Sequence, residues 1–428
     1  MKLKPYPKYK PSGVEWLGEV PEHWEVKRLK NAFKIFNGST PESSNEEYWD
    51  GDIIWYTPED LGDNAEKIIN DSRRKITLKG YKNIGATIVP PESIIISTRA
   101  PIGHLSVTKV PACTNQGCRS LVPKDGVLSD YYYYYLSISK AHLNAIGKGT
   151  TFIELGNQGL GTYSIPFLPF DEQQLIASFL DRETGKIDEL ILKKEKLIEL
   201  LKEKRTALIS RAVTKGLNPD VRLKPSGVEW LGDVPEGWEV KRVKFSAKTV
   251  MGQSPNSDEY TDDNESLPFL QGNADFNERY PTPRIFCDTS NKVINKGALL
   301  ISVRAPVGAI NEADQKYGIG RGLCAINPDK VLSKDYLWYA LHIVREELNT
   351  LATGSTYDAV SADQVGNMRI TLPPFSEQQS IASFLDRETG KIDALMEKVR
   401  LAIEKLKEYR TALISAAVTG KIDVRGVA

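Results

Sequence analysis

The sequence predicts a mixed α/β protein with a pseudo-two-fold internal repeat: two similar globular domains separated by two long antiparallel helices that form a coiled coil. Two observations support this fold class. Most phrases of the first half return in the second, and each half ends in a long charged stretch without proline. A chain of 428 residues is also long enough to form several domains, each with its own buried core.

The repeat divides the chain into two halves. KPSGVEWLG at 10–18 returns at 224–232, and the STRAPIGHL of 97–105 returns as SVRAPVGAI after an offset of 205 residues. PFDEQQLIASFLDRETGKIDEL, which starts at Pro169, returns with 19 of its 22 letters unchanged. By contrast, the segments 37–90 and 251–297 hardly match. The halves therefore share a repeated frame and differ in an insert.

The start of each half reads as a compact domain. Short apolar runs such as DIIWYT, ATIVPPESIIIST and ALLISVRAPVGAI are broken by Gly, Pro and Asn, which indicates short strands with some helix. A helical stretch follows each domain. The expected boundaries are a first domain at 1–170, a helix at 171–215, a second domain at 216–375, and a helix with a C-terminal tail at 376–428.

The two helical stretches carry a heptad pattern. Apolar residues alternate at intervals of three and four for more than three heptads, which is typical of a coiled-coil seam. The predicted seam positions are Ile187, Leu190, Leu197, Leu201 and Leu208 in the first helix and Ile392, Leu395, Val399, Leu406, Tyr409 and Leu413 in the second. Pseudo-two-fold pairing would make the helices antiparallel. The alternative is two amphipathic helices, each packed on its own domain.

Composition and motifs predict no catalytic site. The sequence contains no GxxxxGK[ST] phosphate-binding loop, and its four His do not recur between the halves. The four Cys lack the spacing of a metal site and are expected to be buried. Acidic stretches such as PESSNEEYWDGD are explained by surface loops, so we expect no metal.

Charge and hydropathy indicate a cytoplasmic protein. The chain has 56 basic and 56 acidic residues, so its net charge is zero, which weakens a nucleic-acid hypothesis without removing it. No apolar run approaches the ~18 residues of a membrane span. The N-terminal MKLKPYPKYKPSG has proline and charge where a signal peptide needs apolar residues.

Several motifs together resemble one family. They are SGVEWLG followed by VPxxWEVKR, then RAPxG, a G-[ST]-T-[FY] loop, and EQQxIAxFLDxxTxKID before the helix, each present twice. This combination is similar to the specificity (S) subunit of type I restriction–modification systems, over nearly the whole chain.

The resemblance implies a DNA-recognition role. In this family two target-recognition domains each read one half of a bipartite site in double-stranded DNA, and two antiparallel helices set the spacer and dock two methyltransferase subunits. Restriction subunits join the complex, and S-adenosylmethionine, ATP and Mg²⁺ act in these partners. The specificity subunit binds no cofactor and has no activity of its own. Residues 187–214 would form a rod of roughly 42 Å as a helix.

The inserts hold the candidate DNA contacts, since divergence between the halves should follow divergence between the half-sites. Side chains such as Arg, Asn and Gln read base edges, and Lys and Arg also bind phosphate. The candidates are Arg73, Arg74, Lys75, Lys79 and Lys82 in the first half and Gln271, Asn273 and Arg284 in the second. A solvated charged face explains the RRK run equally well. YYYYYL at 131–136 is interpreted as core rather than as a base-stacking surface.

Two Gly- and Thr-containing loops are candidates for phosphate contact. Lys148, Thr150 and Thr151 lie in GKGTTF, and Ser355 and Thr356 lie in TGSTYD. Small residues let a loop approach a DNA backbone closely, but a simple turn before the next strand is an equally good reading. At the level of function, a stand-alone DNA-bridging or regulatory protein is the alternative to a specificity subunit.

Overall fold

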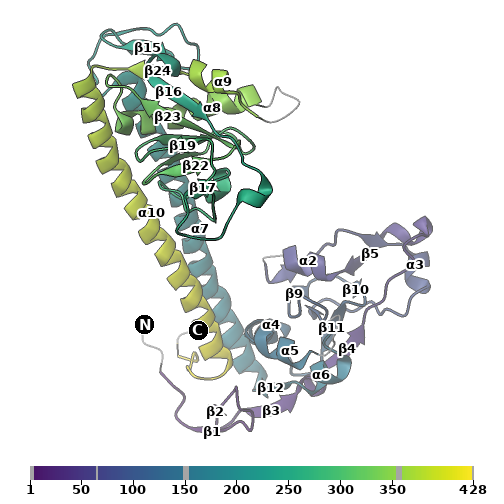
Figure 1. The fold of residues 1–428 in the computed structure, drawn as a ribbon. Coiled ribbons are helices and arrows are strands. Elements are labelled where there is room, and N and C mark those ends of the chain that lie inside the picture. Colours follow the sequence, from purple (N-terminus) through teal and green to yellow (C-terminus); the bar gives the residue numbers. More distant parts are fainter. Residues whose placement is uncertain (1–3, 64–65, 148–153, 353–358, 427–428) are drawn as a thin grey trace. The chain divides into compact units, whose positions relative to one another are not determined.

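The computed structural model describes residues 4–63, 66–147, 154–352 and 359–426. The chain forms two compact units, residues 1–194 with 401–428 and residues 195–400. Each unit contains one globular domain together with parts of the two long helices. The mixed α/β fold class predicted from the sequence is confirmed, with the same frame built twice (Figure 1).

The long helices are α7 (Phe170–Lys215) and α10 (Phe375–Val418), of 46 and 44 residues. Asp188 of α7 is paired with Arg410 of α10, and Arg205 of α7 is paired with Asp393 of α10. Because the earlier α7 residue meets the later α10 residue, the helices run antiparallel, as predicted.

The first domain is built from short strands and helices. A five-stranded sheet has the order β4-β11-β8-β9-β6, and a three-stranded sheet has the order β10-β5-β7. Its strands are β1 (Tyr9–Pro11), β2 (Glu19–Pro21), β3 (Glu25–Arg28), β4 (Phe33–Asn37), β5 (Trp49–Tyr56), β6 (Ile68–Ile69), β7 (Lys75–Ile76), β8 (Ser93–Ser97), β9 (Leu105–Thr108), β10 (Ala112–Thr114), β11 (Cys118–Pro123) and β12 (Ser164–Phe167). Its helices are α1 (Leu29–Ala32), α2 (Pro58–Asp63), α3 (Leu78–Lys82), α4 (Ser129–Ile138), α5 (Lys140–Ile146) and α6 (Asn157–Thr162), with a 3-10 turn η1 (Glu46–Tyr48).

The second domain repeats this plan with two four-stranded sheets, β16-β23-β20-β21 and β18-β17-β22-β19. Its strands are β13 (Leu223–Pro225), β14 (Asp233–Pro235), β15 (Glu239–Arg242), β16 (Ala247–Met251), β17 (Pro268–Leu270), β18 (Ile285–Phe286), β19 (Val293–Ile294), β20 (Leu299–Ser302), β21 (Ile310–Glu312), β22 (Tyr317–Ile319), β23 (Leu323–Pro328) and β24 (Arg369–Leu372). Its helices are α8 (Lys334–Ala352) and α9 (Ala362–Asn367), with 3-10 turns η2 (Val243–Phe245), η3 (Ser257–Glu259) and η4 (Asn273–Asp275).

The central strands are covered on both faces. All five residues of β8, SIIIS, are buried, as expected for a strand without a solvent-facing side. In β20, successive side chains point to opposite faces of the sheet, so neighbouring residues pack into different cores. Leu299 and Ile301 pack into one cluster with the ends of the long helices, and Leu300 packs into a second cluster. The long helices are therefore part of the second domain's core.

A buried glutamine ties the start of each long helix to its domain. Gln173 Nε2 donates to the carbonyl oxygens of Gly126 and Leu168, both at 2.9 Å, and Gln173 Oε1 accepts from Leu128 N at 2.8 Å. Gln378 makes the same three kinds of bond in the second half. Each helix direction is thus fixed at the domain by a repeated polar contact.

Four of the eleven predicted seam residues are exposed and lie outside the seam. Leu190, Leu197, Leu395 and Tyr409 are exposed by 42%, 39%, 44% and 58%. Five predicted residues are buried, Ile187 and Leu201 in α7 and Ile392, Val399 and Leu413 in α10, and Leu208 and Leu406 are partly buried. The buried residues that the prediction missed are Ile191 and Ile198 in α7 and Met396 and Ile403 in α10.

The seam error has a physical cause. A period of 3.5 residues fits a 3,4 alternation and a 4,3 alternation equally well. Each helix offers apolar side chains at both choices, such as Leu190 and Ile191 or Leu395 and Met396. The 4,3 choice also brings Arg205 and Arg410 to their aspartate partners on the other helix. Tertiary contacts therefore decided the register.

Candidate nucleic-acid interface

The first three residues of the predicted basic run are exposed or half-buried, and two of them pair with acids of their own domain. Arg73 Nη1 donates to Glu59 Oε2 at 3.2 Å, and its other terminal nitrogen pairs with Asp63. Lys75 Nζ lies 2.9 Å from Asp71 Oδ1, and this contact lowers the pKa of the Asp71 carboxyl. The charge of this run is largely neutralised locally.

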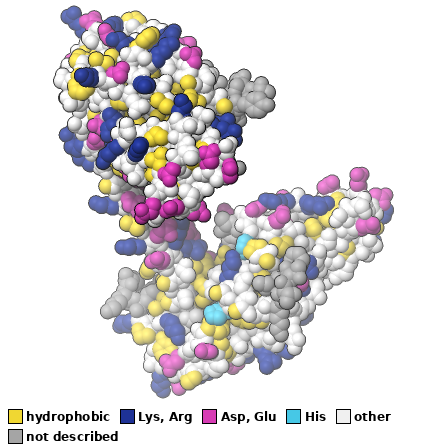
Figure 2. Space-filling view, in the orientation of Figure 1, with side chains coloured by type: hydrophobic (Ala, Val, Ile, Leu, Met, Phe, Trp, Pro, Cys, Tyr) yellow, Lys and Arg dark blue, Asp and Glu magenta, His cyan; other side chains and the backbone are white. Residues whose placement is uncertain are grey.

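Of the other three cations, only Lys79 has an acidic partner in the part of the chain that the structure describes. Lys79 pairs with Glu47, and the Arg74 guanidinium carbon lies 3.5 Å from the centre of the Trp49 ring, a cation–π contact. Lys82 is exposed at the end of α3, with no hydrogen bond or ion pair among the described residues. Figure 2 shows Lys and Arg side chains interspersed with Asp and Glu side chains on the visible face of each domain. The run therefore resembles a solvated face more than a phosphate cradle.

The three candidates of the second insert lie close together. Buried Asp275 accepts from Gln271 N at 2.9 Å and lies 4.0 Å from Arg284 Nε. Arg284 Nη2 donates to Ala274 O at 2.8 Å, and Asn273 is the first residue of the same 3-10 turn. The exposed side chains of Gln271 and Arg284 thus lie beside the same 3-10 turn and have the chemistry needed to contact a base edge.

Sequence reasoning missed a pair of loop-tip residues, Gln116 and Arg321. They stand at the same position of the repeat, 205 residues apart, and both are exposed. The residue after each tip is a glycine whose carbonyl oxygen accepts from the same strand end: Gly117 O from Thr98 N at 2.8 Å and Gly322 O from Val303 N at 2.9 Å. The repeat offset combined with this glycine was the signal that could have revealed them.

Close backbone contacts hold both tips in place. A Cβ on Gly38 would lie 1.8 Å from Asn115 O, and a Cβ on Gly252 would lie 2.0 Å from Gly320 O. Only glycine allows such approach without displacing the loop. A Cβ on Gly322 would lie 2.5 Å from Gln271 O, so the second tip packs directly on the Gln271 turn. The GIGRG stretch is therefore a structural support for Arg321.

The two glycine- and threonine-containing loops cannot be placed in this interface. Lys148, Thr150, Thr151, Ser355 and Thr356 lie outside the described residues. Their contact with phosphate remains a prediction.

The interpretation of YYYYYL as core is confirmed. Tyr131, Tyr132 and Tyr135 are fully buried in α4, and their hydroxyls donate to carbonyl oxygens of Val418, Pro166 and Ser164. Burial raises the pKa of all three phenols above the usual value. These rings are not available for base stacking.

The cysteines are buried and free, as predicted. Burial raises the pKa of the Cys113 and Cys324 thiols to about 12, which keeps them protonated at neutral pH. Within the part of the chain that the structure describes, no group of three or more His, Cys, Asp or Glu side chains could hold a metal ion. None of the described helices is long and apolar enough to cross a membrane.

A family comparison identifies the duplicated frame. The model of the type I restriction modification DNA specificity domain matches residues 21–201 and again residues 235–405. The chain belongs to this family. Each half is one specificity domain with its long helix, so the exposed loop tips described above sit on DNA-specificity domains.

Individual relatives agree with this assignment along almost the full chain. The type I restriction enzyme MjaIX specificity subunit of Methanocaldococcus jannaschii is 29% identical over 430 residues, which are 95% of each chain. The putative MjaX specificity subunit of the same organism is 29% identical over 428 residues, 96% of each chain.

Solved structures show the same fold. A chain from a structure titled as the basis of complex assembly and conformational transition of the type I R-M system matches with a TM-score of 0.78 and 23% identity, over 94% of this chain and 99% of that one. The HsdS subunit of Thermoanaerobacter tengcongensis matches with a TM-score of 0.58 and 23% identity, over 94% and 98%.

Proposed function

We propose that this chain is the DNA sequence-recognition subunit of a type I restriction–modification complex, in which each half reads one half of a bipartite, asymmetric site. Residues 1–170 and 216–375 serve as the target-recognition domains. The helix at 171–215 and the helix with its tail at 376–428 serve as spacers. The complex works where the cell's DNA is, in the cytoplasm.

One observation carries the proposal: a repeated frame presents different side chains at the same exposed position. Gln116 and Arg321 occupy equivalent loop tips held by glycine contacts. Glutamine pairs best with adenine, whereas arginine pairs best with guanine in the major groove. Two copies with unlike tips would read unlike half-sites, which makes the site asymmetric.

The neutral charge of the chain supports a role within a complex. Three of the five candidate cations of the first insert are paired with acids, which reduces the charge available to bind phosphate without help. Partner subunits that flank the DNA would supply the missing neutralisation. We propose two methyltransferase subunits and restriction subunits as these partners. S-adenosylmethionine, ATP and Mg²⁺ act there, and this chain contributes recognition without chemistry.

The proposal is tested by sequencing native DNA for N6-methyladenine with and without this gene, in cells that hold the partner subunits. We expect a bipartite motif that disappears with the gene. Gln116→Ala should relax base preference in one half-site only, and Arg321→Ala in the other. Unchanged methylation without the gene would contradict the proposal. A gel shift with the isolated chain at ordinary salt separates it from the stand-alone alternative, which requires specific binding without partners.

A further inference from the structure

The two inserts differ in sequence but place one cation at the same point of the frame. Lys67 O accepts from Val107 N at 2.8 Å, and Arg279 O accepts from Glu312 N, also at 2.8 Å. Val107 and Glu312 are the same repeat position, 205 residues apart. Lys67 and Arg279 are therefore structural equivalents, and each directly follows a glutamate, Glu66 or Glu278.

In the first unit this cation reaches the long helix. Lys67 Nζ lies 2.6 Å from Asp181 Oδ1 of α7 and 3.1 Å from Asp130 Oδ1 of α4. Tyr134 donates its hydroxyl hydrogen to Asp181 Oδ1 at 2.6 Å and lies 3.3 Å from Thr184 Oγ1. Lys67 thus joins the insert to two helices through one ammonium group.

This contact is more than a solvated surface pair. The Lys67 side chain is only 18% exposed. Asp130 Oδ1 is buried, and no described group makes a hydrogen bond to it; its 3.1 Å contact with Lys67 is an ion pair outside hydrogen-bond geometry. Without Lys67, a buried carboxylate oxygen would lose its counter-charge, which is costly in a poorly solvated place.

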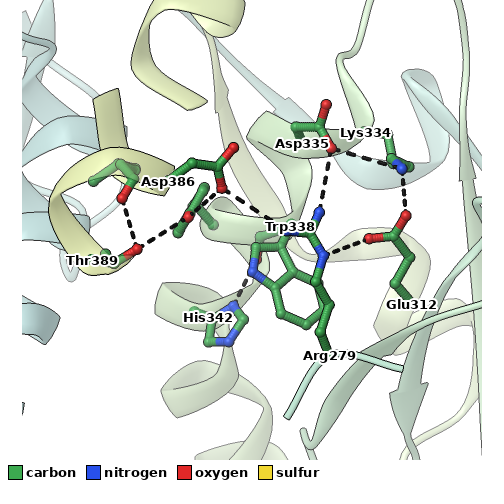
Figure 3. Close-up of polar contacts among 10 residues, drawn as sticks. Arg279, Glu312, Lys334, Asp335, Trp338, His342, Asp386 and Thr389 are labelled. Carbon is green, nitrogen blue, oxygen red and sulfur yellow. Dashed lines mark hydrogen bonds and ion pairs between the residues drawn. The ribbon is translucent and has the colours of Figure 1, made fainter. Parts of the chain in front are cut away.

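The second unit builds the same arrangement around an arginine (Figure 3). Arg279 Nη2 lies 3.6 Å from Asp335 Oδ1 of α8, and Nη1 lies 4.0 Å from Asp386 Oδ1 of α10. Tyr339 donates to Asp386 Oδ1 at 2.7 Å and lies 3.3 Å from Thr389 Oγ1. The longer distances to the aspartates reflect an extra acid in this copy.

That extra acid is Glu312, which is nearly buried. Arg279 Nε donates to Glu312 Oε2 at 2.9 Å, and Lys334 pairs with the other oxygen of the same carboxylate. Arg279 also lies with its guanidinium carbon 5.3 Å from the centre of the Trp338 ring. The position of the cation is the same in both copies, while its side chain and its local partners differ.

The repeated acceptors form what we call the socket. It consists in the first unit of Asp130, Tyr134, Asp181 and Thr184 and in the second of Asp335, Tyr339, Asp386 and Thr389. Every socket residue belongs to the repeated frame, and only the cation comes from the divergent insert. A repeated frame that carries inserts of different sequence needs one common attachment point, and the socket provides it.

We infer that the socket seats each recognition insert on its long helix through one cation, so that Lys67 and Arg279 are positioning residues for half-site reading. The inference rests on the proposed function for its consequence in DNA recognition. Its structural core, the anchoring of the insert, does not depend on that function.

The anchoring is tested in the free full-length chain by hydrogen–deuterium exchange. Lys67→Met should speed exchange of the Val107 amide about tenfold through local opening, and leave the Glu312 amide unchanged. Arg279→Met should do the reverse, and Lys67→Arg should behave like wild type. Matched controls are Lys109→Met and Lys241→Met, which break the exposed pairs with Glu92 and Glu239 outside the sockets.

The possible outcomes separate the inference from the proposed function. If Lys67→Met prevents folding, Asp181→Asn removes the socket charge at constant shape and should give the same local opening. Exchange at Val107 no faster in either variant than in Lys109→Met overturns the inference. In the assembled complex, Lys67→Met should broaden base preference about tenfold in one half-site of the methylated motif and not in the other. Equal broadening in both half-sites also overturns it. If the wild-type complex methylates no bipartite motif, the proposed function is refuted. Hydrogen–deuterium exchange at Val107 and Glu312 still tests whether the socket anchors the insert.

Discussion

Arg410 holds Asp188 with two hydrogen bonds: Nε donates to Oδ1 at 2.8 Å and Nη2 donates to Oδ2 at 3.0 Å. The pair links the end of α10 to the start of α7 in one unit. Its counterpart in the other unit is Arg205, whose Nε donates to Asp393 Oδ1 at 3.0 Å. An arginine–aspartate contact, with two hydrogen bonds in one unit and one in the other, therefore recurs with the internal symmetry and supports the register of the antiparallel helices.

Loss of this pair should weaken the helix pairing measurably but modestly. Because the Arg410 and Asp188 side chains are 35% and 46% exposed, solvent screening limits the effect of Arg410→Met to about 1 kcal/mol of unfolding free energy, measured by urea titration. The matched control is Arg400→Met, which breaks an exposed pair with Glu397 within one helix and should cost about 0.3 kcal/mol. Equal effects of the two variants would contradict a role in register.

A methyl group at Gly38 should disturb the first loop tip. The new Cβ would lie 1.8 Å from Asn115 O, so the backbone must move, at a cost of about 1–3 kcal/mol in unfolding free energy. We expect Gly38→Ala to relax the base preference in the half-site read by Gln116, measured in the methylated motif. The other half-site should keep its base preference. Gly156→Ala, where no atom lies within 4 Å of the new Cβ, should leave the motif intact. Loss of both half-sites together would point to general unfolding instead.

Exposed apolar side chains on α7 should contribute to partner docking. Leu192 and Leu200 are 65% and 48% exposed, and in this family the long helices dock the methyltransferase subunits. Leu192→Ser or Leu200→Ser should change the unfolding free energy by less than about 0.5 kcal/mol. We expect binding of the methyltransferase subunit to weaken about tenfold, measured by titration calorimetry. Lys196→Ser serves as the polar control on the same helix, and binding unaffected by either leucine variant would exclude both leucines from docking.

Two buried thiols should make stability fall at alkaline pH. Burial raises the pKa of Cys113 and of Cys324 from 9.0 to about 12. A raised folded-state pKa means that the unfolded chain releases its thiol proton first, so the stabilisation is present below pH 9 and is lost between about pH 9 and 12. From pH 8 to pH 10, each thiol should cost about 1.4 kcal/mol of unfolding free energy, measured by urea titration. The double variant Cys113→Ala with Cys324→Ala should show a shallower decline, and an unchanged decline would contradict this assignment.

The sequence was sufficient for the doubled frame, the long helices and the burial of the tyrosine run. Repetition of the same phrases requires the same fold twice, whatever that fold is. Proline-free, heptad-patterned stretches leave the helix as the favoured conformation. In α4, the run of tyrosines beside a leucine carries so much apolar ring surface that burial against the domain was the favoured prediction. These features depend on residue patterns that are local in the sequence, so the sequence alone predicts them.

Only the tertiary structure decided which of two apolar stripes is the seam, because Leu190 and Ile191 satisfy the heptad equally well and packing chooses between them. The same holds for DNA-facing candidates. Most of the cations in the run from Arg73 to Lys82 are occupied by neighbouring groups, whereas Gln116 and Arg321 emerge as exposed tips through glycine contacts distant in sequence. The equivalence of Lys67 and Arg279 is likewise a fact of backbone hydrogen bonding. Their flanking sequences share only the spacing of Asp63 and Glu66 before Lys67 with that of Asp275 and Glu278 before Arg279. The socket fixes the place of one charge and leaves the rest of the insert free to vary.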